Sequence, residues 1–266
     1  MQLLKTIIVV LYLILPGYTV SADNSRWLSA GTGAGFVQTQ DQGFSPLIYG
    51  GLQWTSTISY HKESLNSQTS LNFQYLTGQM TTSKTHVMQS AMDHAAMIVT
   101  AGHTRRISKI SDDNRIIKVG SMLSTQYTSK LHHKFRNSER QNYLLSQFSL
   151  QLSLLQHIKV SDRTFCIEAD VNFPLLAYVV RHSYSYPLPE GWLGNTPQRF
   201  STYITNGRFL TWPDYSGLGI YAGLTRTIIN GHAIGLGYQW QYNQLTVLNP
   251  LKSASHQLVV KTMFSF

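Results

Sequence analysis

Hydrophobic and polar residues alternate along most of the chain, which is the pattern of β-strands with two different faces. Phe148, Leu150 and Leu152, for example, alternate with Ser149 and Gln151. Ten segments of this kind are expected to be strands: 26–38, 47–61, 68–79, 92–106, 114–131, 139–158, 163–178, 215–229, 232–244 and 254–266. Most exceed the mean globular strand of about 5–6 residues and suit a tilted membrane strand, which needs about 9–11 residues in the hydrocarbon. The pattern predicts an all-β protein.

The connections between these segments alternate between short and long. The short ones are 62–67, 107–113, 159–162 and the Asn230-Gly231 pair, a strong hairpin signal. The longer ones are 39–46, 80–91, 132–138, 179–214 and 245–253. Short periplasmic turns and longer extracellular loops are typical of a transmembrane antiparallel β-barrel. The sequence therefore predicts about ten barrel strands with both chain ends in the periplasm. Twelve is the alternative, with two more strands near 174–186 and 199–211.

Composition narrows the class of protein. Only 12% of the 266 residues are charged, against roughly 25% in soluble domains, yet mean hydropathy is only -0.13. A disordered chain would have more charge and fewer aromatic residues. A helical membrane protein would need apolar runs of about 20 residues, and the mature chain contains none. A single cysteine excludes a disulfide framework and a Cys-based zinc site.

The first 22 residues are expected to be a cleaved signal peptide. Lys5 precedes an uninterrupted apolar run from Ile7 to Leu15, and Val20-Ser21-Ala22 fits the small-x-small cleavage pattern. The apolar run is too short to span a bilayer. Residues 1–22 are thus assigned to the signal and residues 23–266 to the barrel domain, with cleavage near Ala22 and export to the outer membrane.

The mature chain resembles the outer-membrane β-barrel proteins of double-membraned bacteria. The resemblance rests on the cleavable signal, the even number of two-faced strands and a final strand that ends in Phe266. Small barrels of this kind also share the segment from Pro46 to Gly51 and the run from Gly237 to Trp240. The resemblance implies a barrel inserted in the outer membrane, and it carries no activity or cofactor with it.

Charged residues are expected in two places. Lys118, Glu168, Asp170 and Lys261 fall on the inward faces of their strands, where charges are costly unless paired, so a salt-bridge cluster in the lumen is expected. A second group forms a basic outer rim: Lys130, His132, His133, Lys134, Arg136 and Arg140. Such a rim near a membrane attracts anionic headgroups or a polyanionic glycan, although a solvated charged loop explains it equally well. The partners considered are outer-membrane lipid, lipopolysaccharide and another outer-membrane protein, and not nucleic acid.

The connection 179–214 far exceeds typical connections of about 4–6 residues, and such loops are usually functional or disordered. Disordered segments have few aromatic residues, whereas this loop is rich in them: Tyr184, Tyr186, Trp192, Phe200, Tyr203, Phe209 and Trp212. The loop is expected to fold over the barrel mouth as a plug or to dock on a partner.

Catalytic and metal signals are weak. His86, Asp93, His94 and His182 lie at or near outer loops, but an adjacent Asp-His pair is common by chance and no second rim acid accompanies it. No Gly-x-Ser-x-Gly elbow, His-Glu-x-x-His motif or calcium loop is present. No cofactor or metal is expected, and enzyme activity is disfavoured.

The resulting hypothesis is a non-enzymatic outer-membrane barrel that acts as a binding or accessory component through its long aromatic loop. The first alternative is a gated channel for small solutes. It would be narrow, because ten strands enclose little more than their own side chains. A lipid-modifying or proteolytic barrel enzyme is the second.

Overall fold

A computed structural model describes residues 25–42, 45–64, 66–82, 91–107, 115–132, 140–160, 163–181, 207–228, 232–247 and 250–266. The strands are β1 (Ser25–Asp41), β2 (Ser45–Glu63), β3 (Ser67–Thr82), β4 (Ala91–Arg106), β5 (Arg115–His132), β6 (Arg140–Val160), β7 (Arg163–Arg181), β8 (Arg208–Leu210), β9 (Tyr215–Thr227), β10 (Ala233–Leu245) and β11 (Leu251–Ser265). Within these ranges, no helix is long and apolar enough to cross a membrane.

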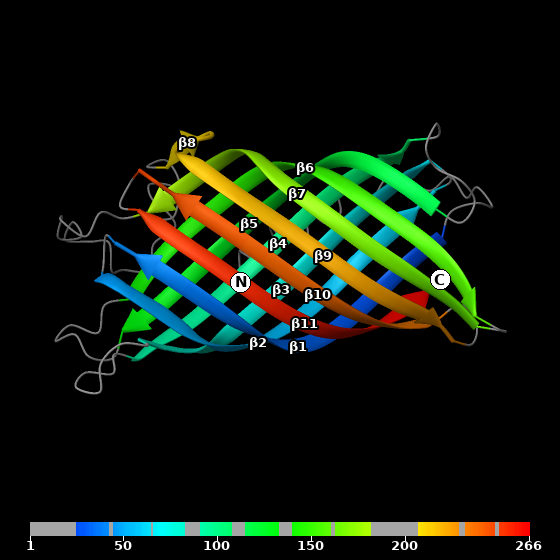
Figure 1. Ribbon diagram of the computed structural model, residues 1–266, viewed down its shortest axis with the longest axis horizontal. Coiled ribbons are helices and arrows are strands. Elements are labelled where there is room, and N and C mark those ends of the chain that lie inside the picture. The colour runs from blue at the N-terminus through cyan, green and yellow to red at the C-terminus, as the bar shows by residue number, and fades with distance from the viewer. Residues whose placement is uncertain are drawn as a thin grey trace, which may run out of the picture.

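Ten of these strands form a closed antiparallel barrel (Figure 1). Neighbours in sequence pair around the barrel, β9 follows β7, and β11 pairs with β1 to close it. The three-residue β8 pairs only with β7 in the described part of the chain. The pairing of β11 with β1 joins the last strand to the first, and a sheet that spans a membrane must close in this way.

The ten predicted strands are confirmed, and the alternative of twelve is not adopted. Residues 174–181 continue β7 instead of starting a new strand, and only β8 lies within 199–211 among the described residues. Most strands run a few residues further than predicted. β1, β3, β5, β7 and β10 end at one end of the barrel, here called the loop end. β2, β4, β6, β9 and β11 end at the other, the turn end (Figure 1).

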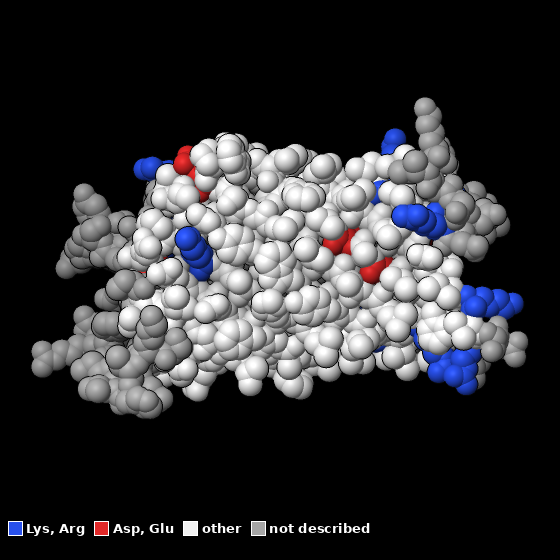
Figure 2. Space-filling view, in the orientation of Figure 1, with Lys and Arg blue, Asp and Glu red and all other residues white. Residues whose placement is uncertain are grey.

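The two faces of the strands are those that the alternation predicts. On β6, Phe148, Leu150 and Leu152 are exposed on the outer wall, while Ser149 and Ser153 are buried inside. Lys and Arg gather towards the two ends of the barrel, and most of the wall between them is uncharged (Figure 2). An apolar belt this extensive is not tolerated on a monomeric protein in water, but it is the surface that a bilayer covers.

Strand β7 pairs irregularly with the strands on both of its sides. β7 carries Pro174, which has no N–H to donate to the ladder, and its register against β6 shifts between Phe148 and Ser149, so that Leu175 has no partner there. β7 pairs with β9 only from Phe165 to Asn172. Beyond that point, Ala177, Tyr178 and Val179 pair with β8 instead. On the edge of β7 away from β6, the partner therefore changes from β9 to β8.

Candidate functional site

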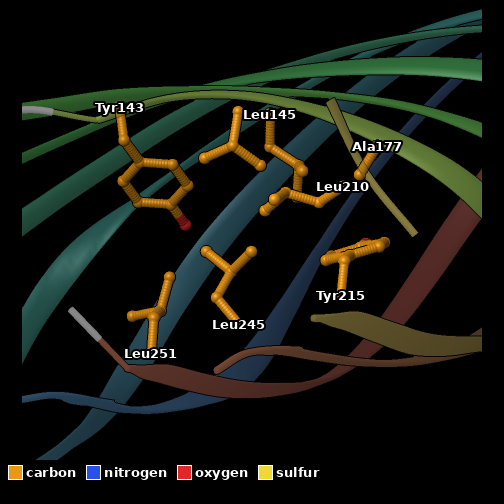
Figure 3. Packing of buried hydrophobic residues seen from close by; sticks show 8 residues of the cluster. Tyr143, Leu145, Ala177, Leu210, Tyr215, Leu245 and Leu251 are labelled. Atoms are coloured by element: carbon orange, nitrogen blue, oxygen red, sulfur yellow. The ribbon is translucent and has the colours of Figure 1, made fainter. Parts of the chain in front are cut away.

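Packed apolar side chains occupy part of the lumen at the loop end. They come from β6, β7, β8, β9, β10 and β11 and point towards one another (Figure 3). The cluster consists of Tyr143, Leu145, Ala177, Val179, Leu210, Tyr215, Leu245 and Leu251. A second cluster, of Val37, Tyr49, Met80 and Met92, packs the opposite wall. The Tyr215 hydroxyl lies within hydrogen-bonding distance of the side-chain oxygens of Gln147 and Asn243, the latter at 2.7 Å, and donates its one hydrogen to either of them. These side chains leave no wide aqueous path through the described loop end.

A buried ionic group lies beside these clusters. Asp41, near the end of β1, accepts a hydrogen bond from Nη2 of Arg181 on β7. Its other carboxylate oxygen lies 3.7 Å from Nζ of Lys130 on β5. Nζ of Lys130 also lies 5.5 Å from the ring centroid of Tyr143. All three charged side chains are almost completely buried. Asp41 therefore ties together three strands across the lumen.

Amide side chains bridge the middle of the lumen. Nε2 of Gln74 on β3 donates to Oε1 of Gln257 on β11 at 2.5 Å and to Thr55 on β2 at 3.1 Å. Nearer the loop end, Gln53 and His94 form a buried side-chain hydrogen bond of 2.7 Å. Since β3 and β11 are separated by two strands in the sheet, the Gln74–Gln257 bond crosses the interior instead of following the wall.

A cavity of about 200 Å³ lies between these bridges and the turn end. The predicted lumen charges all face inward, but they do not form one cluster. Lys261 and Glu168 face each other at 4.0 Å, with the Lys261 ammonium 4.7 Å from the Tyr221 ring centroid. Lys118 pairs instead with Glu63 at 2.5 Å and donates to Gln68. Glu63 was missed because its strand was expected to end at residue 61.

One residue of the predicted basic outer rim, Lys130, lies inside the barrel. Lys130 points into the barrel and is paired with Asp41, so its charge does not reach the surface. The backbone of His132 and Arg140 is in strands, but their side chains are not described. His133, Lys134 and Arg136 lie outside the described residues. Lys130 was misplaced because the strand was expected to give way to a loop at residue 132, which left its inward direction unrecognised.

The long loop is described only at its two ends. Val179 to Arg181 belong to β7 and residues 208–210 form β8, so the connection is shorter than the predicted 179–214. Leu210 packs into the apolar cluster at the mouth. Phe209 and Trp212 point away from it and are 71% and 79% exposed. The other aromatic residues of the predicted set lie outside the described residues: Tyr184, Tyr186, Trp192, Phe200 and Tyr203.

The Asp-His pair does not form a catalytic dyad. His94 is buried in the lumen against Gln53, whereas Asp93 lies on the outer face and accepts from Nε2 of Gln79 at 3.1 Å. Successive residues of a strand point to opposite faces, which separates the two side chains. His86 and His182 lie outside the described residues. Among the residues that are described, no three His, Cys, Asp or Glu side chains are grouped to hold a metal ion.

Sequence reasoning missed the two ends of the ionic group at the mouth. Asp41 and Arg181 were both assigned to loops, and the structure puts both at strand ends facing inward. A signal was present for Asp41, because it continues the inward series of Val37 and Thr39 at a spacing of two. Nothing local to Arg181 indicates its partner, which is 140 residues away in the chain.

The chain resembles known proteins in its three-dimensional fold and not in its sequence. No protein-family model matches the sequence, and no curated protein matches it. The outer membrane protease OmpT from Escherichia coli has a TM-score of 0.51 at 9% identity, over 93% of this chain and 99% of that one. The translocator domain of the autotransporter NalP from Neisseria meningitidis has a TM-score of 0.40 at 11% identity, over 98% and 94%.

At 9% identity, the likeness to OmpT concerns the fold and not the activity. The similarity in fold extends over nearly the whole of both chains. The apolar outer belt and the polar, charge-paired lumen agree with that architecture. This chain has the fold of the bacterial outer-membrane β-barrel proteins.

Proposed function

We propose that this chain is a non-conducting outer-membrane barrel that binds a partner through the segment joining β7 to β9. Export by the N-terminal signal and insertion in the outer membrane are part of the proposal. The turn end then faces the periplasm and the loop end faces outwards, as short turns and longer loops imply. Recovery of the native protein from the soluble periplasmic fraction would contradict it.

The closed loop end is the observation that carries the proposal. Eight apolar or aromatic side chains pack together inside the barrel, and the Asp41 group lies beside them. A channel would need a continuous hydrated path, and these packed side chains stand where such a path would cross the loop end. The closed mouth therefore supports a binding role over a narrow gated channel.

β8 supports the choice of binding surface. Leu210 anchors this short strand in the mouth, and its pairing with β7 holds the backbone in place. Phe209 and Trp212 project outwards from that anchored segment. The Phe209 ring packs only obliquely on Tyr178, with ring centroids 4.8 Å apart. Rigidly held, exposed aromatic side chains are the residues that most often dominate protein interfaces. The partner class we favour is another outer-membrane protein.

Planar-bilayer recordings of the purified protein are expected to show no conductance. A variant in which residues 184–212 are replaced by a short Gly-Ser linker should insert normally and also remain silent. The reason is that Tyr143, Tyr215 and the Asp41 group still occupy the mouth. Steady ion flow through the wild-type protein would overturn the non-conducting assignment and restore the channel alternative.

Extraction in mild detergent is expected to recover the partner with the wild-type protein. Replacing both Phe209 and Trp212 by Ala should remove it without changing the heat-dependent gel migration of the barrel. The control is Trp54→Ala, which removes an exposed tryptophan from the outer wall and should retain the partner. Loss of lipopolysaccharide instead of a protein would assign the surface to lipid, and an unchanged set of co-purifying molecules would refute the binding surface.

A further inference from the structure

Basic side chains surround the barrel on its outer face at the turn end. Residues that share a face of a strand are two positions apart, so the register assigns one outward Lys or Arg at this end to each of six strands. They are Arg26 of β1, Lys62 of β2, Arg105 of β4, Arg115 of β5, Arg163 of β7 and Arg226 of β9. Lys and Arg are correspondingly frequent at the end of the barrel where the C-terminus lies (Figure 2).

The acidic side chains of the described residues lie elsewhere. Three face the lumen, one is buried at the mouth, and two lie at the loop end: Glu63, Glu168, Asp170, Asp41, Asp93 and Asp214. Within the described ranges, the outer face of the turn end thus has no acidic side chain of its own. Its charge attracts an anion from outside the protein.

Arg163 and Arg226 are neighbours on this face. Arg226 lies directly opposite Phe165 in the ladder between β9 and β7, and Arg163 comes two residues before Phe165 on the same face of β7. Residues in this diagonal relation are about 7–8 Å apart, which is within reach of long side chains. Both arginines are exposed, and neither forms a salt bridge with an acidic side chain of the described structure. Two like charges at this distance repel each other unless an anion lies between them.

The two arginines lie at the edge of the apolar belt. Leu224 precedes Arg226 by two residues on the outer face of β9 and is 47% exposed, and Ile167 follows Phe165 on the outer face of β7 and is 38% exposed. A bilayer covers the exposed apolar side chains of such a wall. The hydrocarbon therefore ends close to Arg163 and Arg226, at the level where the phosphate groups of the lipids begin.

The phosphate of an anionic lipid matches this pair of arginines. A guanidinium group is planar and donates two parallel hydrogen bonds to two oxygens of one phosphate. Basic side chains next to a membrane also attract anionic lipids electrostatically. A zwitterionic lipid brings a cation together with its phosphate, and the arginines repel that cation. Phosphatidylglycerol brings the negative charge alone, so the pair should prefer it to phosphatidylcholine.

We propose that Arg163 and Arg226 form a headgroup site for an anionic phospholipid in the membrane leaflet at the turn end. The phosphate lies between the two guanidinium groups, and the acyl chains lie along Phe165 and Leu224. The apolar wall beside the charges favours a lipid over an acidic polymer from the aqueous phase. The site rests on the membrane insertion that belongs to the proposed function, and it is independent of the partner surface at the opposite end of the barrel.

Native mass spectrometry of the full-length protein in detergent tests the lipid class. With phosphatidylglycerol and phosphatidylcholine supplied in equal amounts, the wild-type protein should retain mainly phosphatidylglycerol. Replacing both Arg163 and Arg226 by Gln should weaken its retention by about tenfold or more, because two cations next to the lipid phosphate are lost. Replacing both by Lys keeps the charge without the planar donors, and retention should fall between these two. Equal retention of the two lipids by the wild type would overturn the site.

The matched control removes two exposed cations from the loop end. Arg208→Gln together with Lys252→Gln changes the net charge by the same amount, but these residues are on β8 and β11, which do not pair. This control should retain phosphatidylglycerol as the wild type does. Heat-dependent gel migration verifies that each variant is folded. An equal loss of the lipid in the control would mean that net charge alone attracts it, and the site would be refuted.

Fluorescence quenching locates the lipid on the barrel. In a Cys166→Ser background, bimane is attached at Ile228→Cys, an exposed position two residues beyond Arg226, and the protein is inserted in phosphatidylcholine nanodiscs. A small fraction of nitroxide-labelled phosphatidylglycerol should quench the bimane more than the same fraction of nitroxide-labelled phosphatidylcholine. Replacing both arginines by Gln should remove that difference. The control is Thr77→Cys, which is exposed on β3 nearer the loop end and should be quenched equally by the two lipids.

The two labelled positions separate failure of this site from failure of the proposed function. Equal quenching by the two lipids at Ile228→Cys would leave membrane insertion intact and overturn the headgroup site alone. Stronger quenching by phosphatidylglycerol at both positions would mean a general attraction to the barrel and would also overturn the site. Absence of quenching by either lipid at both positions would contradict insertion in the membrane, and with it the proposed function.

Discussion

Replacing Leu150 by Arg is expected to lower the free energy of unfolding by about 2–4 kcal/mol, the usual cost of a cation on the lipid face near the bilayer midplane. Leu150 is the central residue of β6 and its side chain is 44% exposed on the outer wall. Gln151→Lys should cost much less, because Gln151 lines the polar cavity that also holds Glu168 and Asp170. Denaturant unfolding in lipid vesicles measures both.

Leu150→Met supplies the matched control, since it keeps an apolar side chain of similar volume and should cost less than about 1.5 kcal/mol. Equal losses for Leu150→Arg and Gln151→Lys would mean that β6 does not present these two faces to lipid and lumen. The comparison tests the orientation of the whole barrel wall, because the alternation is continuous around the sheet.

Asp41→Asn is expected to destabilise the barrel by about 3–5 kcal/mol, the usual effect of breaking a buried ion pair. The substitution removes the carboxylate that the buried cations Arg181 and Lys130 share. The same unfolding experiment measures the loss. Asp214→Asn, which changes an exposed carboxylate, should stay within about 0.5 kcal/mol of the wild type.

A triple variant separates charge from packing at the same place. Asp41→Leu, Lys130→Met and Arg181→Met together remove all three charges, and apolar replacement of a buried ionic group is often neutral or stabilising. The triple variant should therefore be more stable than Asp41→Asn alone. If Asp41→Asn is as stable as the wild type, water reaches these groups and the mouth is more open than the structure indicates.

The strands and their faces were predictable because both depend on a two-residue period that is local in sequence. Leu150 and Gln151 could be assigned to opposite faces from their neighbours alone. Strand ends were harder, since Asp41 and Arg181 have the composition of loops but complete a strand in the barrel. Their burial depends on each other, and the sequence does not show which distant residue will lie opposite.

The short ladder between β7 and β9 was not predictable for a related reason. Pro174 is visible in the sequence and marks an irregular strand. Its effect depends on the register of β7 against β6 and on β8 replacing β9 as its partner. Alternation predicted that Asp170 faces inward, and only the folded barrel shows that it lies between Ser153 of β6 and Tyr221 of β9.

The pairing of β11 with β1 also determines how the barrel can assemble. Their ladder joins residues such as Trp27 and Ser265, which are separated by almost the whole chain. Contacts between residues so far apart form slowly, because the intervening chain must be ordered first. Until β11 is available, β1 has one open edge that can pair with another chain. Folding intermediates should therefore be open sheets that aggregate easily. A chaperone that binds the unfolded chain should increase the yield of folded protein most when it is present before β11 pairs with β1.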